Sequence, residues 1–550
     1  MKKRLISLGT LLIATISLTA CDFLMPFIDG GSDEYSYRSH GKSSSEEEVS
    51  FSDSIDSSKP KETEITANQA SYTYMDYIQN NANDLSSTPC LGSANLLIIP
   101  VWFTNSSNFI SSSKRDTVRS DIESSYFGTN EATGWRSVKT YYEEESHGAL
   151  TLTGKVSDWY ECNESYSNYG SDDGYVTKTR NLVSKATTWY FNNNPSDARR
   201  NYDRDGDGYL DGVMVIYAAP DYGSLKNDRL DNLWAYCYWM GDSTAKSIIN
   251  PGINVFFWAS YDFMYGSNTV NARTGNRNYY GGDTRHCSLD AHTFIHEMGH
   301  MFGLDDYYDY SKNNYKPAGM FSMQDHNIGS HDPFSVYALG WGKAYVPTES
   351  VTINLKKFTT TGEMILLSPS FNTYNSPFDE YLLLEYYTPT ELNELDTTYA
   401  YQNSYPKGSS ERGIRLWHVD ARMLYTTNGY VDATKMTTNP RTTSGRVLQA
   451  MTNTYDDGQE VTQDYLSPLG VSYYDYNFLQ LIRKSTSATY KPTDNFSTDS
   501  LFREGAEFTM DRYKRQFVKS GKFNSGKELG FSFRVNKIEL DYISVSIYKD

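Results

Sequence analysis

Short apolar runs in the first half of the sequence predict strands. Leu96–Phe103 is a continuous apolar run with β-branched residues at its centre, which is typical of a buried strand. Val213–Tyr217 and Asn254–Ser260 have the same character, and Leu150–Val156 alternates apolar and polar residues. We therefore expect four strands in this half, separated by polar loops.

Helical spacing appears in three further segments of the same half. Val138–Tyr142 and Thr177–Tyr190 predict helices, and so does the first part of Ala291–Asp306. In that last segment apolar residues recur three and four positions apart, which places them on one core-facing stripe. The residues of this stripe are Ile295, Met298 and Phe302. Either Ser288 or Asp290 is expected to cap the start of the helix.

From about residue 347 the pattern changes to strands alone. Short apolar runs between polar loops lie at residues 351–355, 364–367, 381–385 and 414–419. Near the C-terminus, apolar residues alternate on both sides of a turn at 539–541, which predicts a hairpin. The alternating residues are Phe531, Phe533 and Val535, then Ile543, Val545 and Ile547. This half predicts an antiparallel β domain of the sandwich type.

The N-terminus carries a targeting segment. Residues 1–20 begin with three basic residues and continue into a short, mostly apolar run, the pattern of a signal peptide. Leu18–Cys21 resembles a bacterial lipobox, which implies that Cys21 is lipidated and becomes the mature N-terminus. The alternative is an ordinary secretory signal followed by an unrelated cysteine. We expect a lipid-anchored protein on the outer face of a bacterial membrane.

The segment after the lipobox predicts a disordered tether, which we place at residues 21–68. Gly41–Pro60 contains eight Ser, five acidic residues and few apolar side chains, so it cannot form a core. Elsewhere no apolar run is long enough to span a membrane. The predicted membrane contact is therefore the lipid anchor alone.

Composition narrows the classes of partner and the disulfide chemistry. The 550 residues carry a net charge of −18, which argues against a nucleic-acid-binding protein with a general basic face. Aromatic residues make up 15% of the chain, which suits contact with proteins or glycans. Of the five cysteines, the four after Cys21 allow two disulfides in any of three pairings. Cys237 also fits the alternative of a small buried residue.

One motif carries the chemistry of a metal enzyme. His296-Glu297-x-x-His300 places two imidazoles one helical turn apart, so both can bind one zinc ion. Glu297 then lies beside the metal, where it can take a proton from a nucleophilic water. The alternative, a surface helix that matches by accident, is weakened by the distribution of histidines. Six of the nine lie between residues 286 and 331.

A third ligand is expected from the turn after the helix. Gly303 can adopt the left-handed conformation that ends a helix and reverses the chain. The reversal would bring Asp306 back toward the ion. Two histidines and one carboxylate leave a position open, which is typical of a catalytic zinc site. Asp305 offers the same chemistry, and composition alone does not choose between the two.

A second motif predicts a calcium site. Hard oxygen ligands recur at the spacing of a calcium loop, with Gly208 at the sharp turn. These ligands are Asp203, Asp205, Asp207, the Tyr209 carbonyl and Asp211. The twelfth position is Met214 rather than an acid, and a strand follows instead of a second helix. We expect a calcium-stabilised loop rather than a switch, and the alternative is an Asp/Gly turn without an ion.

The motif around His296 resembles the metzincin metalloproteases, and its longer form resembles the immune inhibitor A family within them. Motif matches extend the resemblance over about residues 90–550. The matching segments are Ser137–Leu150, His296–Asp309, His331–Trp341 and Gly413–Asp420. The metzincin spacing selects Asp306 rather than Asp305 as third ligand. It also implies a methionine turn beneath the metal, for which we favour Met323 over Met320.

The resemblance implies an α+β fold and a division into domains. A metzincin-like zincin domain, with a twisted mixed sheet and the active-site helix, is expected at 69–346. Within it, residues 69–90 correspond to the remnant of a pro-segment, and Cys90 lies in the region where some metzincins carry a cysteine that keeps them latent. An antiparallel β-sandwich-like domain follows at 347–550. In metzincins an edge strand upstream of the helix binds the substrate, a role we assign to Asn254–Ser260.

Two functions compete on this sequence. The first is a cell-surface zinc metalloendopeptidase that hydrolyses extracellular proteins or peptides, with Glu297 as general base. The second is a surface binding or adhesion lipoprotein that keeps a protease-like scaffold. The β-rich half and the aromatic residues allow the second function. The intact Glu297 favours the first, because a scaffold needs no base beside the metal.

Overall fold

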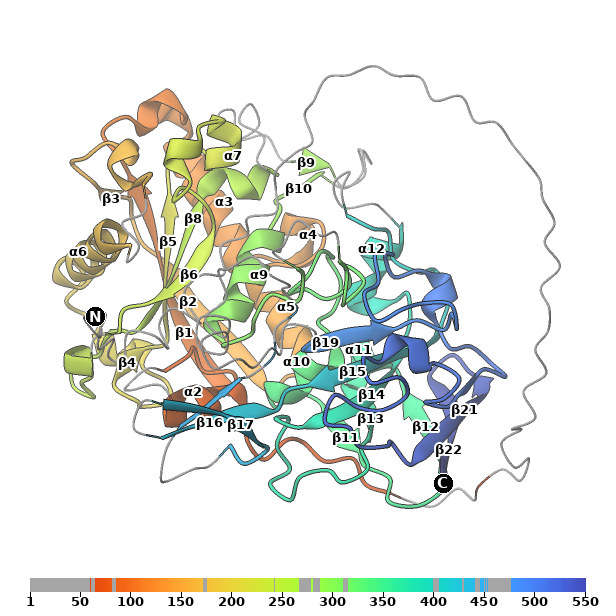
Figure 1. Cartoon of the computed structure of the whole chain (residues 1–550). Helices are drawn as coiled ribbons and strands as arrows, with labels where there is room; N and C mark the ends of the chain where they lie inside the picture. Colours follow the sequence, from red (N-terminus) through yellow and green to blue (C-terminus); the bar gives the residue numbers. More distant parts are fainter. Residues whose placement is uncertain are drawn as a thin grey trace.

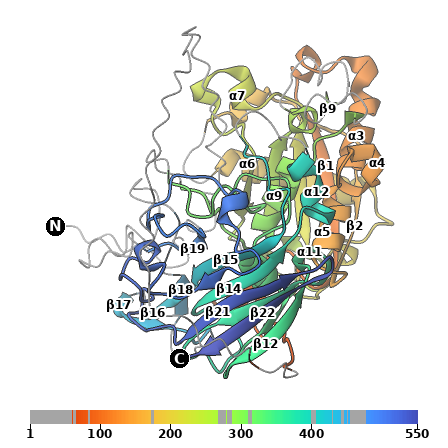
Figure 2. The same ribbon diagram turned by 90° about the vertical axis from the view of Figure 1, so that its right-hand side faces the viewer.

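The structure is a computed structural model, shown in Figures 1 and 2. It describes residues 60, 65–81, 86–171, 176–241, 243–266, 278–279, 287–309, 315–398, 405–427, 430–440, 446–449, 451, 453 and 476–550. The predicted signal peptide at 1–20, the predicted lipidation site Cys21 and the predicted tether up to residue 59 lie outside this set. Within it, no helix is long and apolar enough to cross a membrane.

The first half is built on a six-stranded mixed sheet. Its main order is β2-β1-β5-β8-β6, with β3 also paired to β1. The strands are β1 (Gly92–Trp102), β2 (Leu150–Val156), β3 (Tyr160–Glu161), β5 (Gly212–Tyr217), β6 (Tyr236–Trp239) and β8 (Val255–Ser260). All pairs are parallel except β6 with β8. The four strands predicted from apolar runs are confirmed.

Helices cover both faces of this sheet, which explains the continuous apolar runs of its central strands. Figure 1 shows α6 on one side of the sheet and α9, α3 and α5 on the other. The helices are α3 (Arg115–Phe127), α4 (Asn130–Thr133), α5 (Val138–Glu145), α6 (Thr177–Asn193), α7 (Tyr222–Leu225), α9 (His292–Met301) and α10 (Pro333–Ala338). Two short pairs add β4 (Tyr209–Leu210) to β7 (Gly252–Ile253) and β9 (Asn278–Tyr279) to β10 (Cys287–Ser288).

Two larger sheets and one small sheet form the second half. The first has the order β11-β13-β14-β15-β19, and the second has the order β12-β22-β21-β20. The strands are β11 (Lys343–Tyr345), β12 (Val351–Lys356), β13 (Glu363–Leu367), β14 (Glu380–Tyr387), β15 (Gly413–Asp420), β19 (Leu479–Ile482), β20 (Glu507–Phe508), β21 (Phe531–Ile538) and β22 (Tyr542–Lys549). The small sheet contains β16 (Met423–Thr427), β17 (Tyr430–Thr437) and β18 (Arg446–Gln449), and two short helices are α11 (Phe358–Thr361) and α12 (Glu394–Thr398).

The sheet that contains β14 is the middle layer of the molecule. Leu382 and Leu384 pack into a cluster shared with the second sheet, whereas Tyr381 and Leu383 pack into the core of the first half. Because successive strand residues point to opposite faces, both faces of β14 are buried. Figure 2 shows this sheet between the second sheet and the helices of the first half. The β11–β13 pair is parallel, unlike the antiparallel pairs predicted here, and β11 precedes residue 347.

The segment before β1 packs across both halves. Helix α2 (Tyr74–Asn81) buries Tyr74 against Phe334 and Phe378. Upstream, Asn68 forms an antiparallel bridge with Ala344, which lies on β11. Residues 65–81, which include the start of the predicted pro-segment remnant, are thus tied to the second half by both backbone and side-chain contacts.

Two expectations from the sequence are wrong. Asn254–Ser260 is not an edge strand, because β8 lies between β5 and β6, and among the described strands β6 ends the sheet. Strand β8 inserts between two strands that precede it along the chain, an order that local patterns do not reveal. The two disulfides also do not form, since Cys90, Cys162 and Cys237 are free and buried. Cys237 instead donates its S–H to the carbonyl oxygen of Glu297, 2.9 Å away.

Candidate metal centre

The helix that carries the motif is buried along its whole length. Helix α9 lies against β6 and β8, and Asp290 accepts a hydrogen bond from the His292 N–H at 3.0 Å, as expected of a residue that caps its start. Gly299 faces the side chain of Gln324 so closely that a Cβ would overlap it. The absence of a side chain at this position lets the loop that contains Gln324 approach the motif.

The two histidines of the motif are oriented by backbone carbonyls. The Nδ1 of His296 lies 2.8 Å from the carbonyl oxygen of Met323, and the Nδ1 of His300 lies 2.8 Å from that of Leu304. A carbonyl oxygen can only accept, so both Nδ1 atoms carry the proton in the neutral rings. Both Nε2 atoms therefore present lone pairs, and they lie 3.3 Å apart. This is the arrangement that metal-binding histidines adopt.

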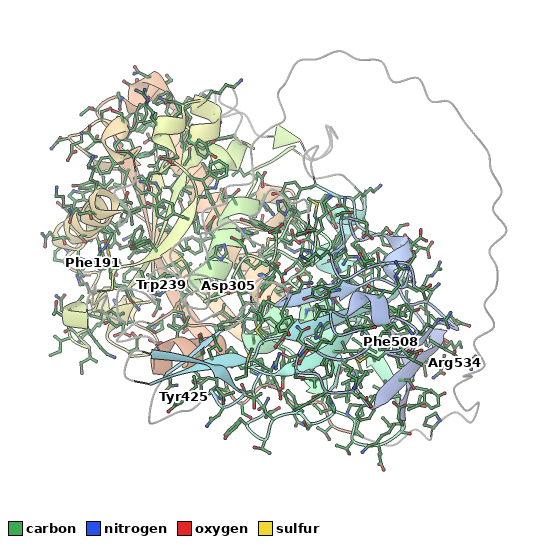
Figure 3. All side chains as sticks on the ribbon, in the orientation of Figure 1. Phe191, Trp239, Asp305, Tyr425, Phe508 and Arg534 are labelled. Carbon is green, nitrogen blue, oxygen red and sulfur yellow. The ribbon has the colours of Figure 1, made fainter. Side chains whose placement is uncertain are left out.

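The turn after α9 brings Asp306 to the same point. Gly303 has a φ of +101°, the left-handed conformation that only glycine adopts without strain. The Oδ1 of Asp306 lies 3.0 Å from the Nε2 of His296 and 3.4 Å from that of His300. Asp305, labelled in Figure 3 beside α9, is only half-buried, whereas the side chain of Asp306 is fully buried.

The donor set fits a divalent metal. Burial raises the pKa of Asp306, but the two imidazoles outweigh it and hold this pKa well below its usual range. Burial likewise lowers the pKa of His300, and the carboxylate of Asp306 outweighs it and raises that pKa. The side chains thus favour a positive charge at the point where two imidazole nitrogens and one carboxylate oxygen meet. Nitrogen and oxygen donors of these types are the common ligands of zinc.

Glu297 lies beside these atoms. Its carboxylate and the ligand nitrogens of His296 and His300 lie within 4.8 Å of one another, and its side chain is buried. Because it precedes His300 by three residues, Glu297 emerges on the neighbouring part of the helix surface. The structure therefore brings together all four residues that the sequence proposed for this centre: His296, Glu297, His300 and Asp306.

The loop beneath the centre contains both candidate methionines. Met323 is buried and supplies the carbonyl that orients His296, whereas Met320 has a positive φ of +59° and lies three residues away. Of the two methionines, Met323 is the one with a described hydrogen bond to a histidine of the motif. The assignment of the methionine turn to Met323 stays a prediction, and this backbone contact supports it over Met320.

A network behind the centre was not identified from the sequence. The amide nitrogen of Gln324 packs 3.3 Å from the Nδ1 of His300, whose proton goes to the Leu304 carbonyl, and the amide oxygen lies 3.3 Å from the Nε2 of His331. His331 in turn contacts the hydroxyl of Tyr141 through its Nδ1 at 2.9 Å, and Glu145 accepts from its backbone N–H at 2.7 Å. The sequence feature that could have pointed to Gln324 is its position directly after Met323, the predicted methionine of the turn.

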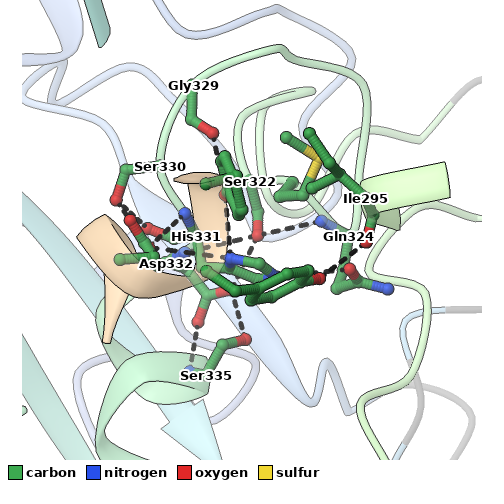
Figure 4. Close-up of polar contacts among 12 residues, drawn as sticks. Ile295, Ser322, Gln324, Gly329, Ser330, His331, Asp332 and Ser335 are labelled. Carbon is green, nitrogen blue, oxygen red and sulfur yellow. Dashed lines mark hydrogen bonds and ion pairs between the residues drawn. The ribbon is translucent and has the colours of Figure 1, made fainter. Parts of the chain in front are cut away.

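The remaining histidines of the region occupy separate positions. His331 is fully buried in the network of Figure 4. His292 donates from Nε2 to the Asn327 carbonyl, and burial lowers its pKa to about 3. His326 pairs with Asp325 at 2.6 Å and packs edge-on against Tyr308. His286 lies outside the described residues. In the second half, His418 is a buried histidine paired with Glu380 at 3.0 Å.

A second group of acidic residues lies in the loop before β5. Carboxylate oxygens of Asp203, Asp205 and Asp211 lie within 4.8 Å of one another. Burial and then the neighbouring carboxylates raise the pKa of Asp205 to about 6, and burial raises that of Asp211 to about 8. Mutually repelling carboxylates of this kind are stabilised by a cation.

The hydrogen bonds of this loop show which of its carboxylates are oriented toward one point. The Asp211 carboxylate accepts from the N–H groups of Arg204 and Asn95, at 2.8 and 2.6 Å, which orients it toward the loop. The Asp207 carboxylate accepts a hydrogen bond from the Tyr209 N–H at 2.8 Å. Asp207 is not one of the three acids whose carboxylate oxygens lie within 4.8 Å of one another. The loop therefore supplies three close carboxylates rather than four.

Comparison with known proteins gives one match. Residues 105–251 match the family model described as immune inhibitor A peptidase M6, catalytic domain. This range contains β2, β3, β5, β6 and the acidic loop, leaves out β1 and β8, and ends before α9 begins. The geometry of the metal centre is thus a separate observation from the family match. No curated protein matches the chain.

Proposed function

We propose that this immune inhibitor A-like metallopeptidase is a zinc-dependent endopeptidase that hydrolyses peptide bonds within proteins. The family match supports a metallopeptidase. The observation that carries the zinc assignment is the meeting of the Asp306 Oδ1 with the Nε2 atoms of His296 and His300, at 3.0 and 3.4 Å. These three atoms would hold the ion and leave room for water and substrate, as catalytic zinc sites do.

Glu297 is the proposed general base. When bound, zinc supplies Lewis acidity, which makes a nearby water a better nucleophile and the scissile carbonyl a better electrophile. Glu297 accepts the proton that the water loses as it attacks the carbonyl carbon. It then delivers that proton to the nitrogen of the leaving amine when the C–N bond breaks, so the carboxylate is restored.

The protein holds this base and its neighbours rigidly. Carbonyl oxygens fix the ring orientation of both histidines, and the Gln324 amide contacts the ring of His300 from behind. The S–H of Cys237 donates to the backbone of Glu297 and ties α9 to strand β6. A centre held by such contacts needs little rearrangement when substrate binds.

Calcium is the second proposed ion. The convergence of Asp203, Asp205 and Asp211 supports a structural site in the loop before β5. Asp207 and the Tyr209 carbonyl, which the sequence motif also contains, complete the proposed ligand set. The loop leads directly into the central strand β5, so an ion there would contribute stability rather than catalysis.

The location of the enzyme is also proposed. The lipobox-like Leu18–Cys21 supports attachment of the mature chain to the outer face of a bacterial membrane by lipid. Protein or peptide substrates would then be extracellular. The alternative of an adhesion lipoprotein is not favoured, because the chain retains a complete set of ligands together with a base.

The proposed function is tested by purified protein with and without a chelator. We expect hydrolysis of denatured casein, loss of this activity with 1,10-phenanthroline, and its recovery with about one equivalent of zinc. Persistence of the activity in metal-free protein would contradict the zinc mechanism. Metal content of about one zinc per chain without any peptidase activity would favour the adhesion alternative.

A further inference from the structure

A hollow on the far side of the first sheet has no part in the proposed mechanism. It lies between α6 and residues 240–253 and has a volume of about 420 Å³. Helix α6 and the helix that carries the metal motif cover opposite faces of the sheet, so the hollow is separated from the metal centre by a layer of strands (Figure 1). This volume is sufficient for a small ligand or the head group of a larger one.

Two arginines line this hollow. Arg180 donates from Nη2 to the carbonyl of Met240, and its buried Nε has no acceptor among the described residues. Arg199 donates from Nη1 to the carbonyl of Pro251 at 3.0 Å, and it packs over the ring of Phe191, which Figure 3 labels at this edge of the molecule. Neither guanidinium forms an ion pair with any residue that the structure describes.

The other polar groups of the lining are neutral. Ser184 and Thr188 contribute hydroxyls from α6, and Asn181 contributes an amide one turn earlier. No acidic side chain is among the described residues of the lining. Burial lowers the pKa of Arg199, and no carboxylate opposes this effect. A partly buried cation without a counter-ion is costly, and binding of an anion would remove that cost.

The positive charge is local. Helix α6 contains Lys178, Arg180 and Lys185 and no Asp or Glu, although the whole chain has a net charge of −18. In a molecule with an acidic surface, a basic hollow attracts anions selectively to one place. Two planar guanidiniums and several hydroxyls offer donors from different directions, a set that suits the oxygens of a tetrahedral anion.

We propose that the hollow between α6 and residues 240–253 binds a phosphate group through Arg180 and Arg199. The free N–H groups of both guanidiniums would donate to the phosphate oxygens, and the hydroxyl of Thr188 would complete the contacts. This assignment rests on the charge and shape of the hollow and does not depend on the peptidase activity.

The loop beside the hollow indicates that the phosphate belongs to a lipid. Ala245 and Ile253 line the hollow, and between them Ile248 and Ile249 are 72% and 83% exposed. The two isoleucines are adjacent and project from a turn whose Ser247 N–H donates to Gly208 at 2.8 Å. An exposed apolar pair next to a phosphate site is suited to contact acyl chains beneath a lipid head group.

The phosphate site is tested by thermal unfolding of the full-length chain. Inorganic phosphate should raise the melting temperature by about 2–5 °C over sodium chloride of equal ionic strength, in a buffer without added calcium. The double variant Arg180→Gln/Arg199→Gln should lose this rise, and Arg200→Gln, an exposed neighbour outside the hollow, should keep it. An equal rise in the double variant, or none in the wild-type protein, would overturn the site.

A second double variant keeps the test valid if the glutamine variant does not fold. Arg180→Lys/Arg199→Lys keeps both charges but loses the planar fork, so it should fold and retain less than half of the temperature rise. If the glutamine variant does not fold, this lysine variant decides the question. A full response in the lysine variant would show a charge effect without the proposed geometry and would overturn the assignment.

The lipid source is tested with soluble phosphate esters. Dihexanoylphosphatidylglycerol, kept below its micelle concentration, should bind at least fivefold more tightly than glycerol 3-phosphate. Ile248→Ser/Ile249→Ser should remove this difference and leave the response to inorganic phosphate unchanged. Equal affinity for the two esters in the wild-type protein would overturn the lipid source and assign the hollow to a water-soluble phosphate.

Discussion

The Nδ1 of His296 lies 2.8 Å from the carbonyl oxygen of Met323, a residue 27 positions further along the chain. This contact fixes the proton on Nδ1 and turns the lone pair of Nε2 toward the Asp306 carboxylate. The loop after α9 thus does two things at once. It supplies the third proposed ligand, Asp306, and it orients the first histidine, so the metal centre and the loop depend on each other.

Glu297→Gln should separate metal binding from catalysis. The substitution keeps size and hydrogen bonding but removes the base, and the proposed ligands remain. We expect about one zinc per chain and a fall in kcat of at least about a hundredfold. Metal analysis and casein hydrolysis measure the two effects on the same sample. Wild-type kcat in this variant would exclude Glu297 as the base.

Asp306→Asn and Asp305→Asn should differ in zinc retention. The Asp306 carboxylate meets both imidazoles, whereas Asp305 is half-buried on the neighbouring position of the turn. Dialysis against a weak chelator should strip zinc from the Asp306 variant and leave most of it in the Asp305 variant, which serves as the matched control. The reverse order would refute the ligand assignment.

Gln324→Leu should weaken the metal site without abolishing it. The Gln324 amide packs 3.3 Å from both His300 and His331. Leucine of similar size fills the same space but lacks the amide group that lies between the two rings. Partners behind a ligand typically contribute about ten- to a hundredfold in metal affinity. Competition with a fluorescent zinc chelator measures the change. Tyr141→Phe, which alters only the far end of the network, should have a smaller effect.

Asp205→Asn should abolish a response to calcium. If the loop binds calcium in the native state alone, 1 mM calcium should raise the melting temperature of the wild-type protein by several degrees. Asp205 is one of the three converging acids, so its loss should remove most of that rise. Differential scanning fluorimetry with and without EDTA gives both values. A wild-type protein that does not respond to calcium contradicts the site.

Asp396→Asn should change how stability depends on pH. Burial raises the pKa of Asp396 in α12 to about 8, whereas in the unfolded chain it is near ~3.9. Between these values the native state keeps a proton that the unfolded state releases, so stability falls as pH rises through this window. The variant should unfold at a higher temperature than the wild type at pH 8.5 and at nearly the same temperature at pH 4. Asp158, which is exposed, provides the control substitution to Asn.

The sequence predicted the features that depend on neighbours along the chain. The helical spacing of His296 and His300 and the left-handed Gly303 are local, and the structure contains both. The role of Gln324 was missed because it reaches His300 only through the path of the loop between them. The order of β5, β8 and β6 was missed for a similar reason, since strand pairing is set by tertiary packing rather than by the pattern within a strand.

The packing of α2 has a mechanical consequence. Ile78 fills the space directly beside Gly303, where a Cβ would overlap it, and the Thr88 N–H donates to the carbonyl of Met301 at 2.9 Å. A chain attached by its N-terminus transmits any pull first to residues 65–81, ahead of the sheet. Force that lifts this segment would remove the Ile78 side chain from Gly303, in the turn that leads to Asp306. If the chain is anchored through Cys21 as proposed, a pull from the membrane would therefore reach the support of the proposed metal ligands before it reached β1.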